Sequence, residues 1–157
     1  DFGSINLDAY LNRVVQTAVQ TMSGDHNVPK PIVEISAGQT TVKEATSLGI
    51  IVSELISNTL KHGCTGGECS FTVRATRDDR TLKMVYKDSS TVKPGTIRSL
   101  SDFPKGGIGF TLIEALVRDH RGTISAASTD GLTIEICLRT DRQLKRTPTR
   151  RRTPADR

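Results

Sequence analysis

Apolar residues recur every three or four positions in three segments of the chain, which is the spacing of one helix face. The first segment spans residues 6–22, and the second runs from about Lys43 to His62, with Gly63 well placed to end it. The third follows the glycine-rich stretch "GGIGF" and continues through "TLIEALVRD". The pattern therefore predicts three amphipathic helices, each with one apolar side to bury.

Other segments alternate apolar and polar residues, which is typical of half-buried β-strands. "PIVEISAG" predicts a short strand, and "SFTVRATRDDRTLKMVYKD" predicts a β-hairpin that turns at Asp78 and Asp79. "GTISAAS" and "GLTIEICLRT" predict two further strands. The order of the elements indicates an α+β fold, a two-layer α/β sandwich whose mixed, mostly antiparallel sheet is covered on one face by the helices.

The composition fits one domain and indicates the kind of core it has, its lack of membrane contact and its cellular location. A chain of 157 residues is long enough for one substantial core, and with 4% aromatic residues this core has to be mainly aliphatic. No stretch approaches the roughly 18 apolar residues that a membrane-spanning helix needs, so we expect no membrane contact by this domain. The cysteines, Cys64, Cys69 and Cys137, favour reduced thiols and a cytoplasmic location.

The net charge of +5 belongs to the C-terminal end of the chain. From Arg142 onward there are seven Lys or Arg residues and one acid, which leaves 15 basic and 16 acidic residues before that point. Like charges in a block with two prolines and few apolar residues are typical of disorder. We therefore expect a folded domain over residues 1–141 and a disordered basic tail over residues 142–157. Nucleic acid is not an expected partner, since no aromatic residues accompany the basic ones.

One predicted helix carries polar side chains at helical spacing. In "VSELISNTLKHG", Glu54, Asn58, Lys61 and His62 lie at offsets 0, 4, 7 and 8. At about 100° per residue they fall on nearly the opposite side from the apolar stripe. This alone is compatible with a solvent-exposed face. An amide and an acid one helical turn apart are also suited to hold Mg²⁺ and a water molecule.

Two further features accompany this helix. Asp88 ends a predicted strand, where an acidic side chain can accept a hydrogen bond from an adenine amino group. A loop at about residues 89–106 follows, and a loop this long in a small domain is usually a lid or a binding loop. It leads into "KGGIGF", whose glycines let backbone N–H groups approach a phosphate at a helix N-terminus.

In this order and at this spacing, the motifs resemble those of the gyrase, chaperone, histidine kinase and MutL superfamily, known as the Bergerat fold. The resemblance covers about residues 5–139 and is strongest to the catalytic domains of bacterial sensor histidine kinases. "ELISNTLKH" is similar to the N box of this family, with Thr59 in place of the usual Ala. The resemblance implies that Asn58 coordinates Mg²⁺ and that Glu54 acts as a general base or orients the attacking group.

The resemblance also implies how the rest of ATP is bound. Asp88 matches the acid that binds the adenine amino group, and "KGGIGF" matches the second glycine box of the family. The residues that this likeness places near the phosphates or the ribose are Lys61, His62, Lys105, Gly107 and Gly109.

The function implied is that of the ATP-binding catalytic domain of a two-component sensor histidine kinase. Such a domain transfers the γ-phosphoryl group of Mg²⁺-bound ATP to a histidine. None of His26, His62 and His120 has the setting expected of a phosphoacceptor. We therefore expect the acceptor on a dimerisation domain, upstream of Asp1 or on another chain, and a response regulator as a further partner.

The first glycine box departs from the family pattern, and two alternatives remain open. It reads "DSSTVKPG", so that Ser90 and Val92 stand where glycines are usual, and Gly95 is the candidate substitute. One alternative is a degenerate, non-catalytic binding module of the same fold. The other is a serine kinase of the anti-sigma-factor type, which needs no histidine domain.

Overall fold

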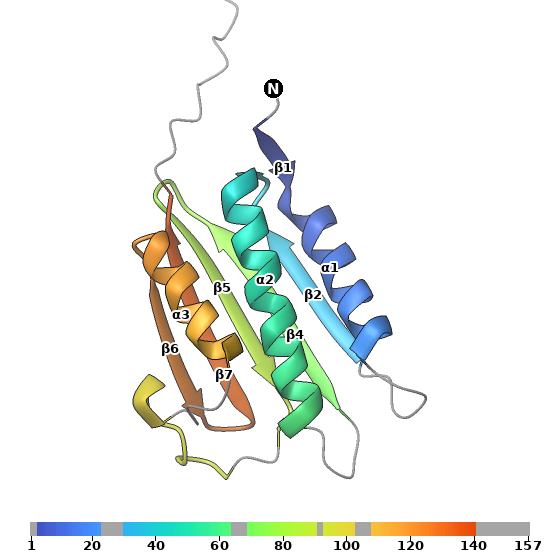
Figure 1. The fold of residues 1–157 in the computed structure, drawn as a ribbon, viewed down its shortest axis with the longest axis vertical. Helices are drawn as coiled ribbons and strands as arrows, with labels where there is room; N and C mark the ends of the chain where they lie inside the picture. Colours follow the sequence, from blue (N-terminus) through green and yellow to red (C-terminus); the bar gives the residue numbers. More distant parts are fainter. Residues whose placement is uncertain (1–2, 23–29, 64–68, 91–92, 103–107, 141–157) are drawn as a thin grey trace, which may run out of the picture.

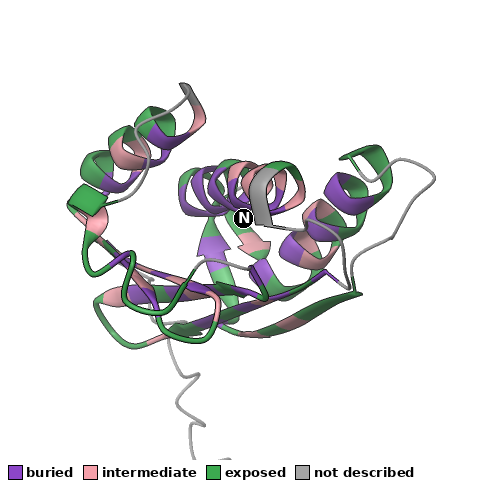
Figure 2. Ribbon diagram, turned by 90° about the horizontal axis from the view of Figure 1, so that it is seen from below, coloured by how far each residue is buried: buried purple, intermediate pink, exposed green. Residues whose placement is uncertain are grey.

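The computed structural model describes residues 3–22, 30–63, 69–90, 93–102 and 108–140. In this part of the chain the helices lie together on one face of a β-sheet (Figure 1). Seen from the end, their buried residues face the sheet, and the opposite sheet face has no helical cover (Figure 2). The expected two-layer α+β sandwich is confirmed.

Most of the helices and strands are those that the sequence predicts. The helical segments are α1 (Leu7–Met22), α2 (Val42–Asn58), a π-helical turn η1 (Thr59–Gly63), a 3₁₀ turn η2 (Leu100–Asp102) and α3 (Ile108–Asp119). The strands are β1 (Ser4–Asn6), β2 (Lys30–Ser36), β3 (Gln39–Thr41), β4 (Ser70–Arg77), β5 (Thr81–Asp88), β6 (Thr123–Ser128) and β7 (Leu132–Arg139).

The main sheet has the strand order β2-β4-β5-β7-β6. β2 pairs with β4 in parallel, and the other neighbours are antiparallel, so the mixed, mostly antiparallel sheet is confirmed. The pairing places Asp88 opposite both Phe71 and Leu132. A separate two-stranded sheet joins β1 to β3. The sequence does not predict this pair, because three residues are too few to show an alternating pattern.

One face of the sheet is apolar because the strands alternate. In β5 the buried side chains include Leu82, Met84 and Tyr86, and in β7 they include Ile134 and Ile136. The β4–β5 hairpin turns where expected, although it lacks a favoured Asn-Gly turn. Instead, Asp78 Oδ1 accepts hydrogen bonds from the backbone N–H groups of Arg80 and Thr81 at 2.9 and 2.8 Å.

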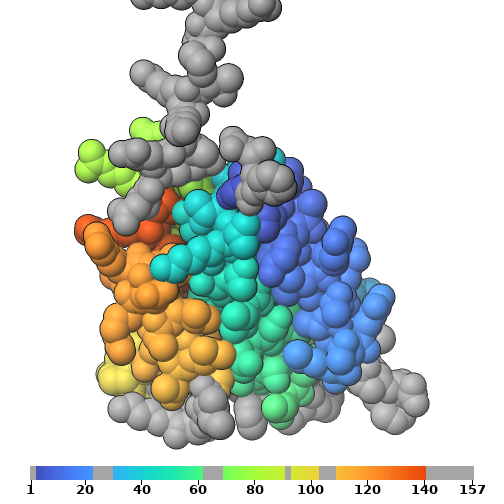
Figure 3. All heavy atoms as spheres, turned by 45° about the horizontal axis from the view of Figure 1, so that its top comes forward, coloured from blue at the N-terminus to red at the C-terminus, as the bar shows by residue number. Residues whose placement is uncertain are grey.

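The three helices lie side by side over this apolar face (Figure 3). In the middle, α2 buries a stripe that includes Leu48, Val52 and Leu55 against the sheet. We expected a regular helix as far as His62, but α2 ends at Asn58 and continues as η1. In a π-helical turn the hydrogen bonds span five residues. The angle of 100° per residue therefore does not apply to Lys61 and His62.

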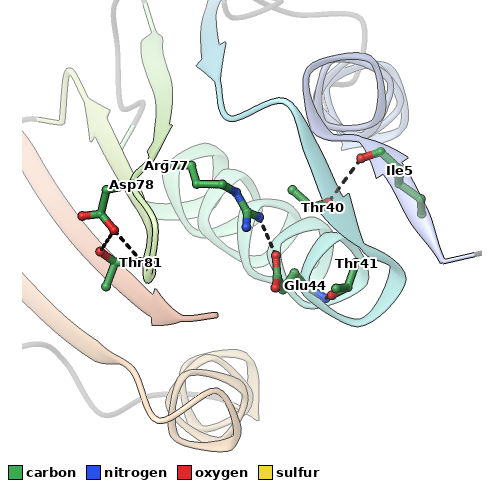
Figure 4. A network of polar contacts seen from close by, with 7 residues as sticks. All are labelled: Ile5, Thr40, Thr41, Glu44, Arg77, Asp78 and Thr81. Carbon is green, nitrogen blue, oxygen red and sulfur yellow. Dashed lines mark hydrogen bonds and ion pairs between the residues drawn. The ribbon is translucent and has the colours of Figure 1, made fainter. Parts of the chain in front are cut away.

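A buried ion pair ties the sheet to the first turn of α2 (Figure 4). Arg77 Nη2 lies 2.6 Å from Glu44 Oε2, and the two side chains are 8% and 7% exposed. Thr41 Oγ1 accepts a hydrogen bond from the Glu44 N–H group at 3.1 Å and caps the helix. This pair lies at the N-terminal end of α2, away from the end of the helix that carries Asn58.

The structure also bears on membrane-spanning helices and on the state of the cysteines. Among the described residues no helix is both long and apolar enough to cross a membrane. Of the described cysteines, Cys137 is free but Cys69 is disulfide-bonded. The expectation of reduced thiols was therefore wrong at Cys69.

We predict that Glu44→Ala lowers the free energy of unfolding by about 3 kcal/mol, because it leaves the Arg77 guanidinium group buried without its carboxylate. The matched control is Glu34→Ala, which removes the partner of Arg74 from a pair whose side chains are 58% and 62% exposed. This control should cost less than about 1 kcal/mol. Urea unfolding followed by circular dichroism measures both, and equal losses would contradict the prediction.

Candidate functional site

The polar segments singled out in the sequence meet at one end of the molecule. The C-terminal end of α2, the end of β5 and the start of α3 all lie in the lower half of Figure 1. Of the segment between β5 and α3, residues 93–102 lie at the same end (Figure 1). Two contacts between side chains and neighbouring elements show how closely these parts approach one another.

The first contact joins α2 to the start of α3. Glu54 is half-buried, and its carboxylate lies where a side chain on Gly109 would be. A Cβ atom added to Gly109 would collide with Glu54 Oε2 and would lie 3.2 Å from Glu54 Cδ. Only a residue without a side chain at position 109 lets the carboxylate and the first turn of α3 lie this close together.

The second contact joins the end of α2 to β5. Thr59 Oγ1 donates a hydrogen bond to Asp88 Oδ2 at 2.8 Å, and the side chain of Asp88 is buried. Asp88 Oδ1 accepts hydrogen bonds from the backbone N–H groups of Ser90 and Leu132 at 3.0 and 3.2 Å. Asp88 is thus held by residues of three different segments, which satisfies a buried polar group that would otherwise be costly.

The other predicted site residues differ in exposure and in how much of them the structure describes. Asn58 is the last residue of α2 and is half-buried. Lys61 is exposed on η1. His62 belongs to the same turn, but its side chain lies outside the described part of the structure, as do the whole of Lys105 and Gly107. The structure therefore brings Glu54, Asn58, Asp88 and Gly109 to one end of the domain.

The altered first glycine box is less unusual in conformation than its sequence suggests. Among the described non-glycine residues only Arg121 has a positive φ, of 50°, so Ser90 has a backbone that any residue can adopt. Gly95 has a φ of 78° and donates its N–H group to the Ser128 carbonyl oxygen at 2.7 Å. Val92 lies outside the described residues.

The described part of the predicted lid is attached to the end of β6 through Ser128. The Ser128 N–H group donates to the Ile97 carbonyl oxygen at 2.8 Å, and Ser128 Oγ accepts from the Ile97 N–H group at 2.8 Å. The side chain of Ile97 is buried in the core. This stretch is therefore anchored to the domain rather than loosely attached.

The residues present fit a nucleotide with a hydrated metal ion. Gly109 lies at the start of α3, where backbone N–H groups and the helix dipole favour a phosphate, and the Glu54 carboxylate fills the place of its missing side chain. Asn58 and Glu54 supply oxygen atoms of the kind that Mg²⁺ prefers, and Mg²⁺ commonly takes only one or two protein ligands beside phosphate and water. Ser90 Oγ is buried and has no hydrogen-bond partner within the described residues.

The chain matches a family model over most of its length. The model is that of the histidine kinase-like ATPase domain, and it matches residues 28–138, from just before β2 to the end of β7. The chain belongs to this family.

Solved structures share the fold of this histidine kinase-like ATPase domain. The histidine kinase domain of the Erythrobacter litoralis EL346 blue-light activated histidine kinase is 21% identical with a TM-score of 0.71, over 85% of this chain and 61% of that one. The mycobacterial sensor histidine kinase MprB is 19% identical with a TM-score of 0.59, over 87% and 97%. The ATP-binding domain of PrrB from Mycobacterium tuberculosis is 17% identical with a TM-score of 0.65, over 89% and 98%.

At such identities these likenesses show a shared fold, and the chain covers 61% of the EL346 histidine kinase domain and 45% of the EL346 blue-light activated histidine kinase. No curated protein matches the chain.

Several residues that build this end of the ATPase domain have no clear signal in the sequence. Tyr86 and Thr59 support Asp88, and Ser128 anchors the segment after it. Gly131 has a φ of 84° and an added Cβ would collide with the Asp88 carbonyl oxygen. Alternation in "MVYKD" does place Tyr86 and Asp88 on the same side of β5, but nothing in the sequence indicates that Thr59 reaches them.

We predict that Ser90→Gly is less stable than Ser90→Ala by about 0.5–1 kcal/mol, because the backbone at position 90 needs no positive φ and glycine loses more entropy on folding. At Arg121, where φ is 50°, the order should reverse, with Arg121→Gly more stable than Arg121→Ala. Chemical unfolding of the four variants tests this. If Ser90→Gly proves the more stable of its pair, the backbone at position 90 is strained.

Proposed function

We propose that this chain is the ATP-binding catalytic domain of a sensor histidine kinase. In this function it transfers the γ-phosphoryl group of ATP to a histidine on a dimerisation domain outside this chain. The observation that carries the proposal is the convergence of Glu54, Asn58, Asp88 and Gly109 at one end of a histidine kinase-like ATPase domain. Two contacts between distant segments support it, Glu54 with Gly109 and Thr59 with Asp88.

The α2 residues would hold the metal and the reacting end of the nucleotide. Asn58 would supply an amide oxygen to Mg²⁺, which neutralises phosphate charge when bound. Glu54 would act as a general base or orient the attacking group, and its half-buried position beside Gly109 keeps its carboxylate at the start of α3. In phosphoryl transfer the protein contributes mainly positioning and charge neutralisation, and these side chains are suited to both.

The remaining residues would bind the rest of ATP. Asp88 would accept a hydrogen bond from the adenine amino group, since its three hydrogen bonds leave about one acceptor position of the carboxylate free. The residues proposed to contact the phosphates or the ribose are Lys61, His62, Lys105, Gly107 and Gly109.

The partners belong to the same proposal. The domain would act on a histidine-containing dimerisation domain, upstream of Asp1 or on another chain, and in a two-component pathway the phosphoryl group would then pass to a response regulator. The proposed location is the cytoplasm, as part of a larger sensor protein, and it rests on the likeness to histidine kinase domains rather than on the cysteines, since Cys69 is disulfide-bonded.

Asn58→Ala tests the site directly. We expect wild-type protein to bind ATP only with Mg²⁺ present. The variant should bind ATP at least about 10-fold more weakly, because a metal ligand is lost. Isothermal titration calorimetry with and without Mg²⁺ measures this. The control is Asn12→Ala, which changes another half-buried helical asparagine, on α1, and should bind like wild type. Indistinguishable binding by wild type and Asn58→Ala would contradict the proposed metal site.

The nature of the phosphorylated product separates the proposal from its alternatives. Phosphohistidine is labile in acid, whereas phosphoserine is stable, so acid treatment of a labelled partner distinguishes the two kinases. Acid-labile label on the dimerisation domain supports the histidine kinase. Acid-stable label on a separate protein would indicate a serine kinase, and a wild-type site that stays empty at millimolar ATP would indicate a non-catalytic binding module.

A further inference from the structure

Three buried side chains form a continuous hydrogen-bonded network that ends at Asp88, in the candidate site. The Tyr86 hydroxyl lies 2.6 Å from Thr59 Oγ1, which in turn lies 2.8 Å from Asp88 Oδ2. Thr59, Tyr86 and Asp88 are 3%, 1% and 4% exposed, so water does not easily replace any of these contacts. The Tyr86 ring also stacks on Phe71, with the ring centroids 5.7 Å apart, which fixes where its hydroxyl points.

The direction of these hydrogen bonds follows from the donors available. A threonine hydroxyl has one hydrogen, and Thr59 donates it to Asp88. The Tyr86 hydroxyl must therefore be the donor to Thr59. Burial raises the pKa of Tyr86, and the nearby Asp88 charge raises it further while the hydrogen bond with Thr59 lowers it, so Tyr86 keeps its proton at neutral pH.

The same hydrogen-bonded network holds the Asp88 carboxyl group in place and limits the ligand groups that it can bind. Its carboxyl group receives hydrogen bonds from Thr59 Oγ1, the Ser90 N–H group and the Leu132 N–H group. A carboxylate has about four acceptor positions, so roughly one remains for a ligand. Such a position can accept a hydrogen bond from an amino group, but it cannot donate one to a keto oxygen.

We infer that Thr59 is a positioning residue for base selection: its hydroxyl, supported by Tyr86, holds the Asp88 carboxyl group so that the remaining acceptor position selects a purine with a 6-amino group. The inference rests on the proposed function, because it concerns the same nucleotide site. It assigns a role to the residue by which this N box differs from the usual one, where alanine has no hydroxyl group to donate.

The test compares two nucleotides that differ only in the 6-amino group, ATP and purine riboside triphosphate, each with Mg²⁺. We expect wild-type protein to bind ATP about tenfold more tightly than the analogue. Thr59→Val keeps the branched shape but removes the hydroxyl, and should lose most of this preference through weaker ATP binding, with analogue binding changed less than about twofold. Thr59→Ser retains the hydroxyl group that Thr59→Val lacks, and it should retain the wild-type preference for ATP.

The preference is a ratio within each variant, so a loss of folded protein lowers both affinities alike and leaves it unchanged. Thr40→Val is the matched control, because Thr40 is also buried, at 1% exposure, and its hydroxyl donates to the Ile5 carbonyl oxygen at 3.4 Å (Figure 4). It should keep the wild-type ratio. If Thr59→Val fails to fold, Tyr86→Phe removes the donor to Thr59 while keeping the ring, and should reduce the preference about threefold.

The outcomes separate this inference from the proposed function. If ATP binds to wild type and the ratio is unchanged in Thr59→Val, or in Tyr86→Phe when only that variant folds, Thr59 does not position Asp88 and the inference is overturned alone. Equal losses of affinity for both nucleotides overturn it in the same way, since they indicate a merely structural role. If wild-type protein binds neither nucleotide, the proposed function is overturned and this inference with it.

Discussion

The packing of α2 on the sheet determines where Glu54 and Asn58 lie relative to Asp88 and Gly109. Its apolar stripe, which includes Leu48, Val52 and Leu55, is buried against one sheet face. Burial of this kind is the main favourable term in folding, so the helix cannot turn or slide without exposing apolar surface. The polar residues Glu54 and Asn58 are consequently held at the sheet end where β5 stops and α3 starts, and the buried Arg77–Glu44 ion pair fixes the opposite end of α2.

A carboxyl group can remain buried at the end of β5 only because its neighbours supply donors. Thr59 and two backbone N–H groups provide three hydrogen bonds to Asp88. Each donor comes from a different segment, so the network also fixes those segments relative to one another. A site organised in this way before a ligand arrives has less ordering to do on binding, which favours affinity.

Much of the fold could be predicted from the sequence, since helices and strands differ in their apolar period. The strands around Tyr86 and Ile134 and the apolar stripe of α2 follow directly from that period. The change from α2 to a π-helical turn at Thr59 could not be predicted, because the apolar period of the segment is that of a regular helix as far as His62. The pairing of β1 with β3 was missed because both strands are very short.

The candidate site was predictable in its parts but not in its assembly. The spacing of Glu54 and Asn58, the acid at the strand end and the glycines before a helix each have a local signal. That Glu54 packs against Gly109, and that Ser90 needs no glycine-like backbone, depend on how distant segments meet. Ser128 gave no signal, because its role is to hold backbone groups of another segment.

The most direct measurement is a crystal structure of the chain with Mg²⁺ and a non-hydrolysable ATP analogue. We predict the adenine amino group within about 3 Å of the Asp88 carboxyl group, the metal ion at the Asn58 amide oxygen and the phosphates at the start of α3. A nucleotide bound elsewhere on the domain, or a site that stays empty at millimolar analogue, would contradict it.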